Sequence, residues 1–197
     1  NTAYNKDDAN TPSAKGLKAE GTLTVNGGTF VLDTADDAIH GGASVTILGG
    51  TFDISSGDDG MHADYIMTIG QKNGGSTTPD IYVRTCYEGI EGAAIHIWSG
   101  KIRVYSEDDG INAANSDLSQ YSFSVNIYGG DVKVYASLGD GLDANGVMNI
   151  RGGEVEVYGG IGNEANNALD CDGALNLLGG TTIGVGQSQM VVTPTTG

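Results

Sequence analysis

The short stretch Asp109–Ala113, with the sequence DGINA, decides the fold because variants of it recur along the chain. Most copies begin with a small or acidic residue, followed by Gly or Ala, a large apolar residue, a polar residue and a small residue. The copies follow one another at intervals of about 21 to 31 residues, which is typical of one coil of a repeat protein. The seven copies are Lys15–Ala19 (KGLKA), Asp37–Gly41 (DAIHG), Asp59–Ala63 (DGMHA), Glu88–Gly92 (EGIEG), Asp109–Ala113, Asp140–Ala144 (DGLDA) and Asn167–Cys171 (NALDC).

A second motif, a glycine pair or Ser-Gly, recurs along the chain at intervals similar to those of the first. Apolar residues alternate with polar ones on both sides of it, as in Val125/Ile127 before Gly129-Gly130 and Val132/Val134 after it. Alternation at period two predicts strands with one buried face. One coil cannot bury its own apolar face, so the coils must stack. The remaining copies are Gly27-Gly28, Gly49-Gly50, Ser99-Gly100, Gly152-Gly153 and Gly179-Gly180.

The two motifs together predict an all-β protein, a right-handed parallel β-helix of about seven coils with three parallel sheets. We expect the β-helix over residues 15–185. Residues 1–14 are expected to be an N-terminal tail or the remnant of an earlier coil, and residues 186–197 a C-terminal tail that continues into a longer protein. Long intervals predict polar loops at 71–79, 114–122 and 159–165.

Composition narrows the classes of partner. The 33 glycines follow no strict three-residue period, which excludes collagen. Against 25 acidic residues stand only 9 Lys and Arg, and the net charge of -16 repels nucleic acid and anionic membranes. No apolar run reaches the roughly 18 to 20 residues of a membrane span. Cys86 and Cys171 fall about 14 Å apart in a stack with about 4.8 Å between coils, so both are predicted to be free thiols.

Acidic residues recur at the same motif positions, and stacking turns them into ladders. Like charges about 4.8 Å apart repel. No matching basic ladder neutralises them, since of the basic residues only Lys18 falls at a motif position. Calcium bound between coils would relieve the repulsion, because it takes 6–8 oxygen ligands. The alternative is that the acids cap turns and face solvent. His40 and His62 favour a polar ladder over zinc, since they lack cysteine partners. The predicted calcium ligands are Asp58, Asp59, Glu88, Glu91, Asp108, Asp109, Asn112, Asp140, Asp143 and Asp170.

Aromatic residues form a second set of ladders. Three Val-Tyr pairs should point Tyr105, Tyr135 and Tyr158 outward on consecutive coils, with Arg103 and Lys133 beside them. Trp98 and Tyr128 occupy outward sites just before the glycine turn. A flat aromatic strip flanked by cations suits a sugar chain. The alternative is that outward tyrosines only favour strand formation.

The ordered series KGLKA, DDAIH, SGDDGMHAD, YEGIEG and EDDGINAA over Lys15–Ala113 resembles a family of extracellular β-helix proteins described as carbohydrate-binding domain-containing proteins. The resemblance extends more loosely to Gly180. It implies a polysaccharide-lyase-like right-handed β-helix, bound calcium, and binding of cellulose and acidic pectic polymers without established lyase activity. It also implies that Asp58, Asp59, Glu88, Glu91, Asp108 and Asp109 are associated with calcium.

The sequence therefore predicts a secreted or surface-displayed binder of plant cell-wall polysaccharide, with no catalytic residue assigned. No nucleophile–base pair stands out, and carboxylates are too abundant to single out a hydrolytic pair. Two alternatives stay open. One is a calcium-dependent polyuronate lyase, and the other is a structural or adhesive stalk domain that binds no sugar.

Overall fold

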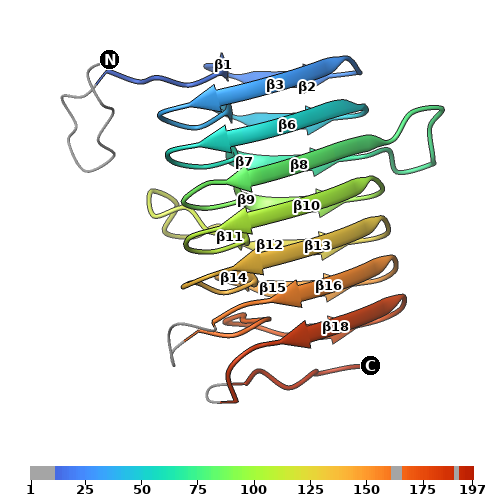
Figure 1. Ribbon diagram of the computed structural model, residues 1–197. Coiled ribbons are helices and arrows are strands. Elements are labelled where there is room, and N and C mark those ends of the chain that lie inside the picture. Colours follow the sequence, from blue (N-terminus) through green and yellow to red (C-terminus); the bar gives the residue numbers. More distant parts are fainter. Residues whose placement is uncertain (1–11, 161–165, 189–190) are drawn as a thin grey trace.

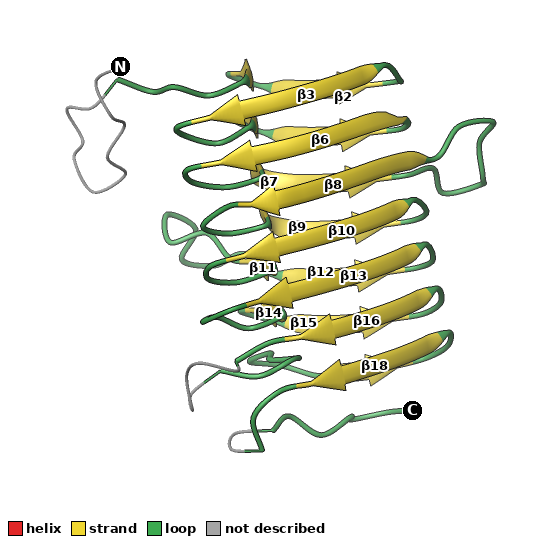
Figure 2. Cartoon of the chain, viewed as in Figure 1, coloured by secondary structure: helices red, strands yellow, loops and turns green. Residues whose placement is uncertain are grey.

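The computed structural model describes residues 12–160, 166–188 and 191–197. Within these ranges the chain is all β, and no helix long or apolar enough to cross a membrane is present. Strands, joined by turns and loops, lie in rows that run the length of the molecule (Figures 1 and 2). Hydrogen bonds join these rows into one sheet of eleven strands and one sheet of seven.

The eleven-stranded sheet is built from strands that successive coils contribute. It contains β1 (Leu17–Ala19), β2 (Thr22–Val25), β4 (Ile39–Gly41), β5 (Ser44–Ile47), β7 (Met61–Ile69), β9 (Ile90–Ile97), β11 (Ile111–Ala113), β12 (Ser124–Ile127), β14 (Leu142–Ala144), β15 (Val147–Ile150) and β17 (Leu175–Leu177). The seven-stranded sheet contains β3 (Thr29–Thr34), β6 (Gly50–Ser56), β8 (Pro79–Thr85), β10 (Lys101–Ser106), β13 (Asp131–Ala136), β16 (Glu154–Tyr158) and β18 (Thr181–Val185).

Every strand pairing is parallel, which confirms the predicted parallel sheets. Each strand pairs with its counterpart one repeat along, so the arrangement is compatible with a β-helical solenoid. The repeat register is confirmed as well. The apolar motif residues align in the order Leu17, Ile39, Met61, Ile90, Ile111, Leu142 and Leu169.

The prediction of three separate sheets is wrong in one respect. The first two rows of strands are joined, because β7 and β9 continue from one row into the next without a break. A register shift between Ala63 and Ile66 takes up the bend. A bulge of this kind lets a strand turn a corner while its ladder continues on both sides.

The core consists of the inward half of each alternating strand. In β10, Ile102 and Val104 are fully buried and pair with Val132 and Val134, which are also fully buried. Removal of apolar surface from water is the main source of stability here. The turn before this sheet needs glycine: Gly130 has φ 105°, and a Cβ there would lie 3.0 Å from the Gly100 carbonyl oxygen. The glycine at the second position of all six copies of this motif has a positive φ.

The predicted loops at 71–79 and 114–122 project from the stack between β7 and β8 and between β11 and β12 (Figure 1). Most of the predicted 159–165 loop and residues 1–11 of the predicted tail lie outside the described residues. Near the C-terminus, Thr195 donates its backbone N–H to the carbonyl of Leu175. Cys86 and Cys171 are buried free thiols, as predicted.

Candidate functional site

The motif residues gather at one corner, between the end of each strand of the seven-stranded sheet and the start of the next strand in the other sheet. We call this the acidic corner and define it by two columns. The inner column is Lys15, Asp37, Asp59, Glu88, Asp109, Asp140 and Asn167, linked through backbone hydrogen bonds from coil to coil. The outer column is Lys18, His40, His62, Glu91, Asn112, Asp143 and Asp170.

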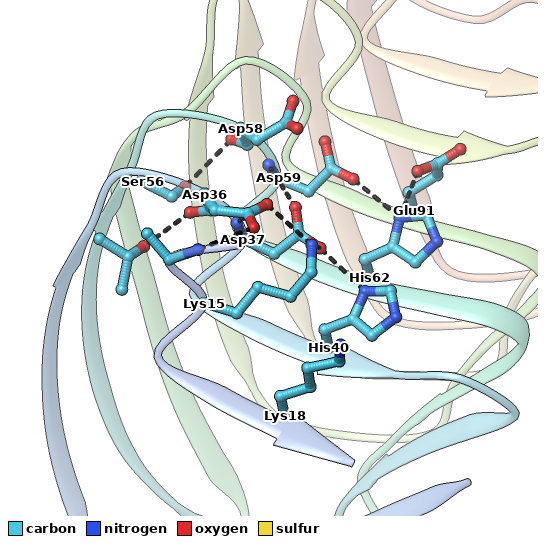
Figure 3. Close-up of polar contacts among 12 residues, drawn as sticks. Lys15, Lys18, Asp36, Asp37, His40, Ser56, Asp58, Asp59, His62 and Glu91 are labelled. Atoms are coloured by element: carbon cyan, nitrogen blue, oxygen red, sulfur yellow. Dashed lines mark hydrogen bonds and ion pairs between the residues drawn. The ribbon is translucent and has the colours of Figure 1, made fainter. Parts of the chain in front are cut away.

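The first half of the acidic corner, through His62, carries its own cations (Figure 3). Lys15 bonds to Asp36 at 2.7 Å and also to Asp37. Both carboxylates are nearly fully buried, and burial alone would raise their pKa values. The lysine, together with His40 on Asp37, outweighs burial and holds both pKa values below their usual range. Sequence reasoning missed Lys15, although it stands at the first position of its motif copy.

Each histidine of the outer column is bonded to the inner-column acid of its own coil. His40 Nδ1 lies 2.8 Å from Asp37 Oδ2, and His62 Nδ1 lies 2.8 Å from Asp59 Oδ2. Glu91 adds a third carboxylate, 2.6 Å from His62 Nδ1. Burial opposes a charge on the His62 ring, but its bonds to Asp59 and Glu91 raise its pKa to about 11. The histidine therefore supplies a positive charge to this part of the corner.

Among the residues that the structure describes, the second half of the acidic corner holds no such cation. Asp140, Asp143 and Asp170 each bring one carboxylate oxygen within 4.8 Å of the other two. Within the described residues, none of the three is ion-paired with lysine, arginine or histidine. Burial and the neighbouring carboxylates raise the pKa of Asp143 to about 7 and that of Asp140 to about 6.

The same causes act on the coils just before this cluster. Burial and the nearby acids raise the pKa of Asp109 to about 6, and burial together with Glu91 raises that of Glu88 to about 8. One oxygen of Asp109 accepts the backbone N–H of Asp140 at 2.7 Å, and Asp140 accepts that of Asn167. Turn capping, the alternative raised from the sequence, thus accounts for one oxygen of each of these two acids. It leaves the charge itself uncompensated.

Asn112 stands between Glu91 and Asp143 in the outer column, and its side-chain oxygen has no hydrogen-bond partner. Its side-chain amide donates to Glu88 Oε2 at 3.0 Å, but its Oδ1 has no hydrogen-bond partner although the residue is only 7% exposed. A buried acceptor without a donor is costly and calls for an explanation. An amide oxygen beside carboxylates is a suitable calcium ligand.

The predicted ligands do not form one cluster. Asp59 and Glu91 belong to the half that His62 neutralises. Asp58 lies near Asp36 and Asp37, and Asp108 accepts a hydrogen bond from the Tyr87 hydroxyl. The remaining predicted ligands, Glu88, Asp109, Asn112, Asp140, Asp143 and Asp170, follow one another along the second half.

The tyrosine row lies on the outer face of the seven-stranded sheet. Tyr105, Tyr135 and Tyr158 stack face to face, with ring centroids 4.8 and 4.7 Å apart and planes within 5°. Because the rings cover one another, they present mainly edges and hydroxyls to the outside. They line one side of a hollow of about 490 Å³, together with Ser106 and Ser137.

The cations beside this row are paired with acids. Arg103 bonds to Asp131 at 2.5 Å, and Lys133 bonds to Glu156 at 2.7 Å. Both pairs link neighbouring coils. The predicted cations are therefore present on the face as expected, but each already has a carboxylate partner.

Trp98 and Tyr128 do not join the tyrosine row. They lie before the glycine turn, after β9 and β12, whereas the tyrosines lie at the far ends of β10, β13 and β16. Their rings stack 3.7 Å apart, and Lys72 from the 71–79 loop lies 5.3 Å from the Trp98 ring. The single aromatic strip expected from the sequence is thus two separate groups.

Comparison with known protein families places a family model over most of the chain. A family model described as "Carbohydrate-binding domain-containing protein" matches residues 1–60 and 70–195. No curated protein and no solved structure matches the chain.

Proposed function

The chain belongs to the family of carbohydrate-binding domain-containing proteins, and from this premise we propose a non-catalytic, calcium-stabilised binder of plant cell-wall polysaccharide. The family match carries the carbohydrate part of the proposal. The polymer and the role of calcium go beyond it, as do a location outside the cell and a right-handed β-helix of about seven coils. These rest on the arguments that follow and on the resemblance of the motif series.

We place the polysaccharide along the tyrosine row. The hollow beside it runs across four neighbouring coils, from β8 to β16, which suits a chain of repeated units better than a single compact ligand. Tyr105 is 39% exposed, and its ring stacks on that of Tyr135, while the Tyr158 hydroxyl donates to Glu156 at 2.7 Å. Tyrosine combines an apolar body with a hydrogen-bonding tip, which matches the mixed surface of a sugar.

The ion pairs on this face favour a neutral polymer such as cellulose over an acidic one. A polyuronate would have to displace Asp131 from Arg103 or Glu156 from Lys133. It would also approach a chain with a net charge of -16. Both effects oppose binding of an acidic polymer at the tyrosine row, unless calcium bridges it elsewhere.

Calcium is proposed for the second half of the acidic corner. Four observations support it: three converging carboxylates, raised pKa values, the unmatched Asn112 oxygen, and the lack of an ion pair to Asp140, Asp143 or Asp170 within the described part of the chain. All the donors are hard oxygens, which calcium prefers. The proposed ligands come from Asp109, Asn112, Asp140, Asp143 and Asp170, and Glu88 lies beside them.

The test is retention on insoluble cellulose and on calcium-gelled polygalacturonate, run beside an ultraviolet assay for unsaturated products. The triple variant Y105A/Y135A/Y158A should bind cellulose at least about tenfold more weakly, equivalent to about 1.4 kcal/mol. W98A/Y128A is the matched control, because it removes a stacked pair from a different face, and it should bind as the wild type does.

Each other outcome decides against part of the proposal. Formation of unsaturated product would make the protein a polyuronate lyase. No retention on any glycan would favour the structural stalk. Loss of binding in the control but not in the triple variant would move the sugar site to Trp98 and Tyr128.

A further inference from the structure

A second hollow lies on the outer face of the seven-stranded sheet, next to the first hollow, which the tyrosine row lines. It has a volume of about 460 Å³ and crosses β6, β8 and β10, with Thr51, Tyr82 and Lys101 among its lining residues. The first hollow crosses β8, β10, β13 and β16 in the same sheet (Figure 1). It lies at the ends of these strands, whereas Thr51 and Lys101 stand at the starts of theirs. Tyr105 lines both hollows, so the two meet at this ring.

Tyr82 is held at the junction of the two hollows by its neighbours. Its ring meets that of Tyr105 edge to face, with centroids 5.9 Å apart and planes 64° apart. The Cζ atom of Arg84 lies 4.3 Å from the centroid of the Tyr82 ring, and Arg84 Nη2 donates to Asp53 Oδ2 at 2.8 Å. A cation over an aromatic face is attracted to it, so this arrangement orients Tyr82 before any ligand binds. A side chain that is already ordered costs little conformational entropy on binding.

The second hollow also offers a charged donor and a charged acceptor for sugar hydroxyls. Lys101 and Asp80 are register partners on β10 and β8, so an ammonium and a carboxylate occupy neighbouring positions. Both residues are exposed, and neither is in an ion pair within the described residues. The ammonium can donate to a hydroxyl oxygen and the carboxylate can accept from a hydroxyl group. The carboxylates of Asp80 and Asp53 repel an acidic sugar, so this hollow also favours a neutral one.

We propose that the second hollow is a further subsite for the same polysaccharide, so that one neutral chain runs obliquely across the sheet from Tyr158, past Tyr105, to Tyr82. This inference rests on the proposed function, since it takes the tyrosine row as the primary sugar site. The first hollow spans three coil intervals, about 14 Å, and the two hollows together span four, about 19 Å. The protein should therefore select long neutral chains over short ones, because the second part of a bound chain makes its contacts intramolecularly.

The experiment is calorimetry on the intact chain in calcium, with soluble cello-oligosaccharides of increasing length. We expect the affinity to rise until the oligomer reaches about 19 Å and then to level off. An oligomer that spans both hollows should bind at least about tenfold more tightly than one that fills only the first. Y82A and K101A should each remove most of this gain and leave the affinity for the short oligomer unchanged. Y65A is the matched control, because Tyr65 is a 42% exposed tyrosine of the other sheet, and it should leave both affinities unchanged.

The results that would overturn this inference differ from those that would overturn the proposed function. Equal affinities for short and long oligomers, or a full gain retained in both Y82A and K101A, would remove the second subsite but leave the tyrosine row. No binding of any oligomer would remove the sugar site itself, and the second subsite with it. If Y82A fails to fold or weakens short and long oligomers alike, K101A decides, because Lys101 is exposed and its loss leaves no acid without an ion-pair partner in the described residues. A gain retained in K101A would then overturn the inference.

Discussion

The two halves of the acidic corner have the same backbone arrangement but differ in how charge is balanced. In the first half, Lys15 and His62 stand among the acids and supply positive charge within the chain. In the second half, the equivalent positions hold Asp109, Asp140 and Asp143, and no cation lies among them in the described residues. A repeated fold can therefore accommodate an acidic ladder in two ways. A basic residue can replace an acidic one in some coils, or the acids can form a site whose negative charge a bound cation balances.

Removal of calcium should have the largest effect. A ligand that binds only the native state at about 1,000 times its Kd adds about 4 kcal/mol to the free energy of unfolding. Thermal melting with calcium and with EDTA measures this. The double variant D140N/D143N should lose the calcium effect, whereas D36N, in the first half, should keep it. Equal melting temperatures for the wild type in calcium and EDTA would contradict the difference between the halves.

Loss of Lys15 should be nearly as costly. K15M leaves Asp36 and Asp37 buried without their lysine, and breaking a buried ion pair from one side costs about 3 kcal/mol. K18Q is the matched control, because Lys18 is half-exposed and pairs with the exposed Glu20, so its loss should cost less than about 1 kcal/mol. Denaturant unfolding compares the two variants. Equal costs would mean that Lys15 is not the internal counter-charge of the first half.

The pH dependence should differ in sign between the second half and the Asp36–Asp37 pair of the first half. Folding raises the pKa values of Asp109, Asp140 and Asp143 to about 6 or 7, above an unfolded value of about 3.9. Their contribution to stability is full below pH 4 and is lost as the pH rises through 6 to 7. For Asp36 and Asp37 folding lowers the pKa, so their contribution is present above pH 4 and is lost as the pH falls.

Metal-free protein should therefore lose stability as the pH rises from about 4 to about 7, by several kcal/mol in all, because each pKa unit corresponds to about 1.4 kcal/mol and folding raises each of the three pKa values by roughly two to three units. Denaturant unfolding across this range measures the slope, and calcium should remove it. An unchanged slope in D140N/D143N would assign the effect to other groups.

The smallest predicted effect is the change in stability caused by one Asp-to-Asn substitution in each half, and its sign should differ between the halves. D143N removes one charge from the second half, where burial and the neighbouring acids disfavour it, so it should stabilise the metal-free protein by about 1 kcal/mol while weakening calcium binding. D37N removes the acid that Lys15 and His40 share, so it should destabilise the protein whether or not calcium is present. Melting of both variants in EDTA provides the comparison. Destabilisation by D143N in EDTA would show that its carboxylate makes favourable contacts of its own.

Much of the fold could be predicted because the repeat specifies its own register. A slip by one residue would turn Ile102 and Val104 outward, so alternation and the glycine turns fix which residues pair. The continuity of β7 and β9 through the corner could not be predicted, since it depends on a bulge after Ala63 that no residue pattern marks.

The site was less predictable because it depends on how far side chains reach between coils. Position alone places Arg103 beside the tyrosines but does not show that it bonds to Asp131 one coil away. In the same way, outward Tyr105 and Tyr135 were expected to form a flat strip, and stacking instead turned their faces toward each other. Motif positions did identify the second half of the acidic corner, since there the charges lie in the repeat itself.

The most direct measurement is a crystal structure of the protein grown with calcium, with anomalous scattering used to locate the ions. We predict an ion bound by oxygens of Asp140, Asp143 and Asp170 in the second half of the acidic corner, and none between Lys15 and His40 in the first. A second half without calcium, or an ion seated among Asp36, Asp37 and His40, would contradict the account.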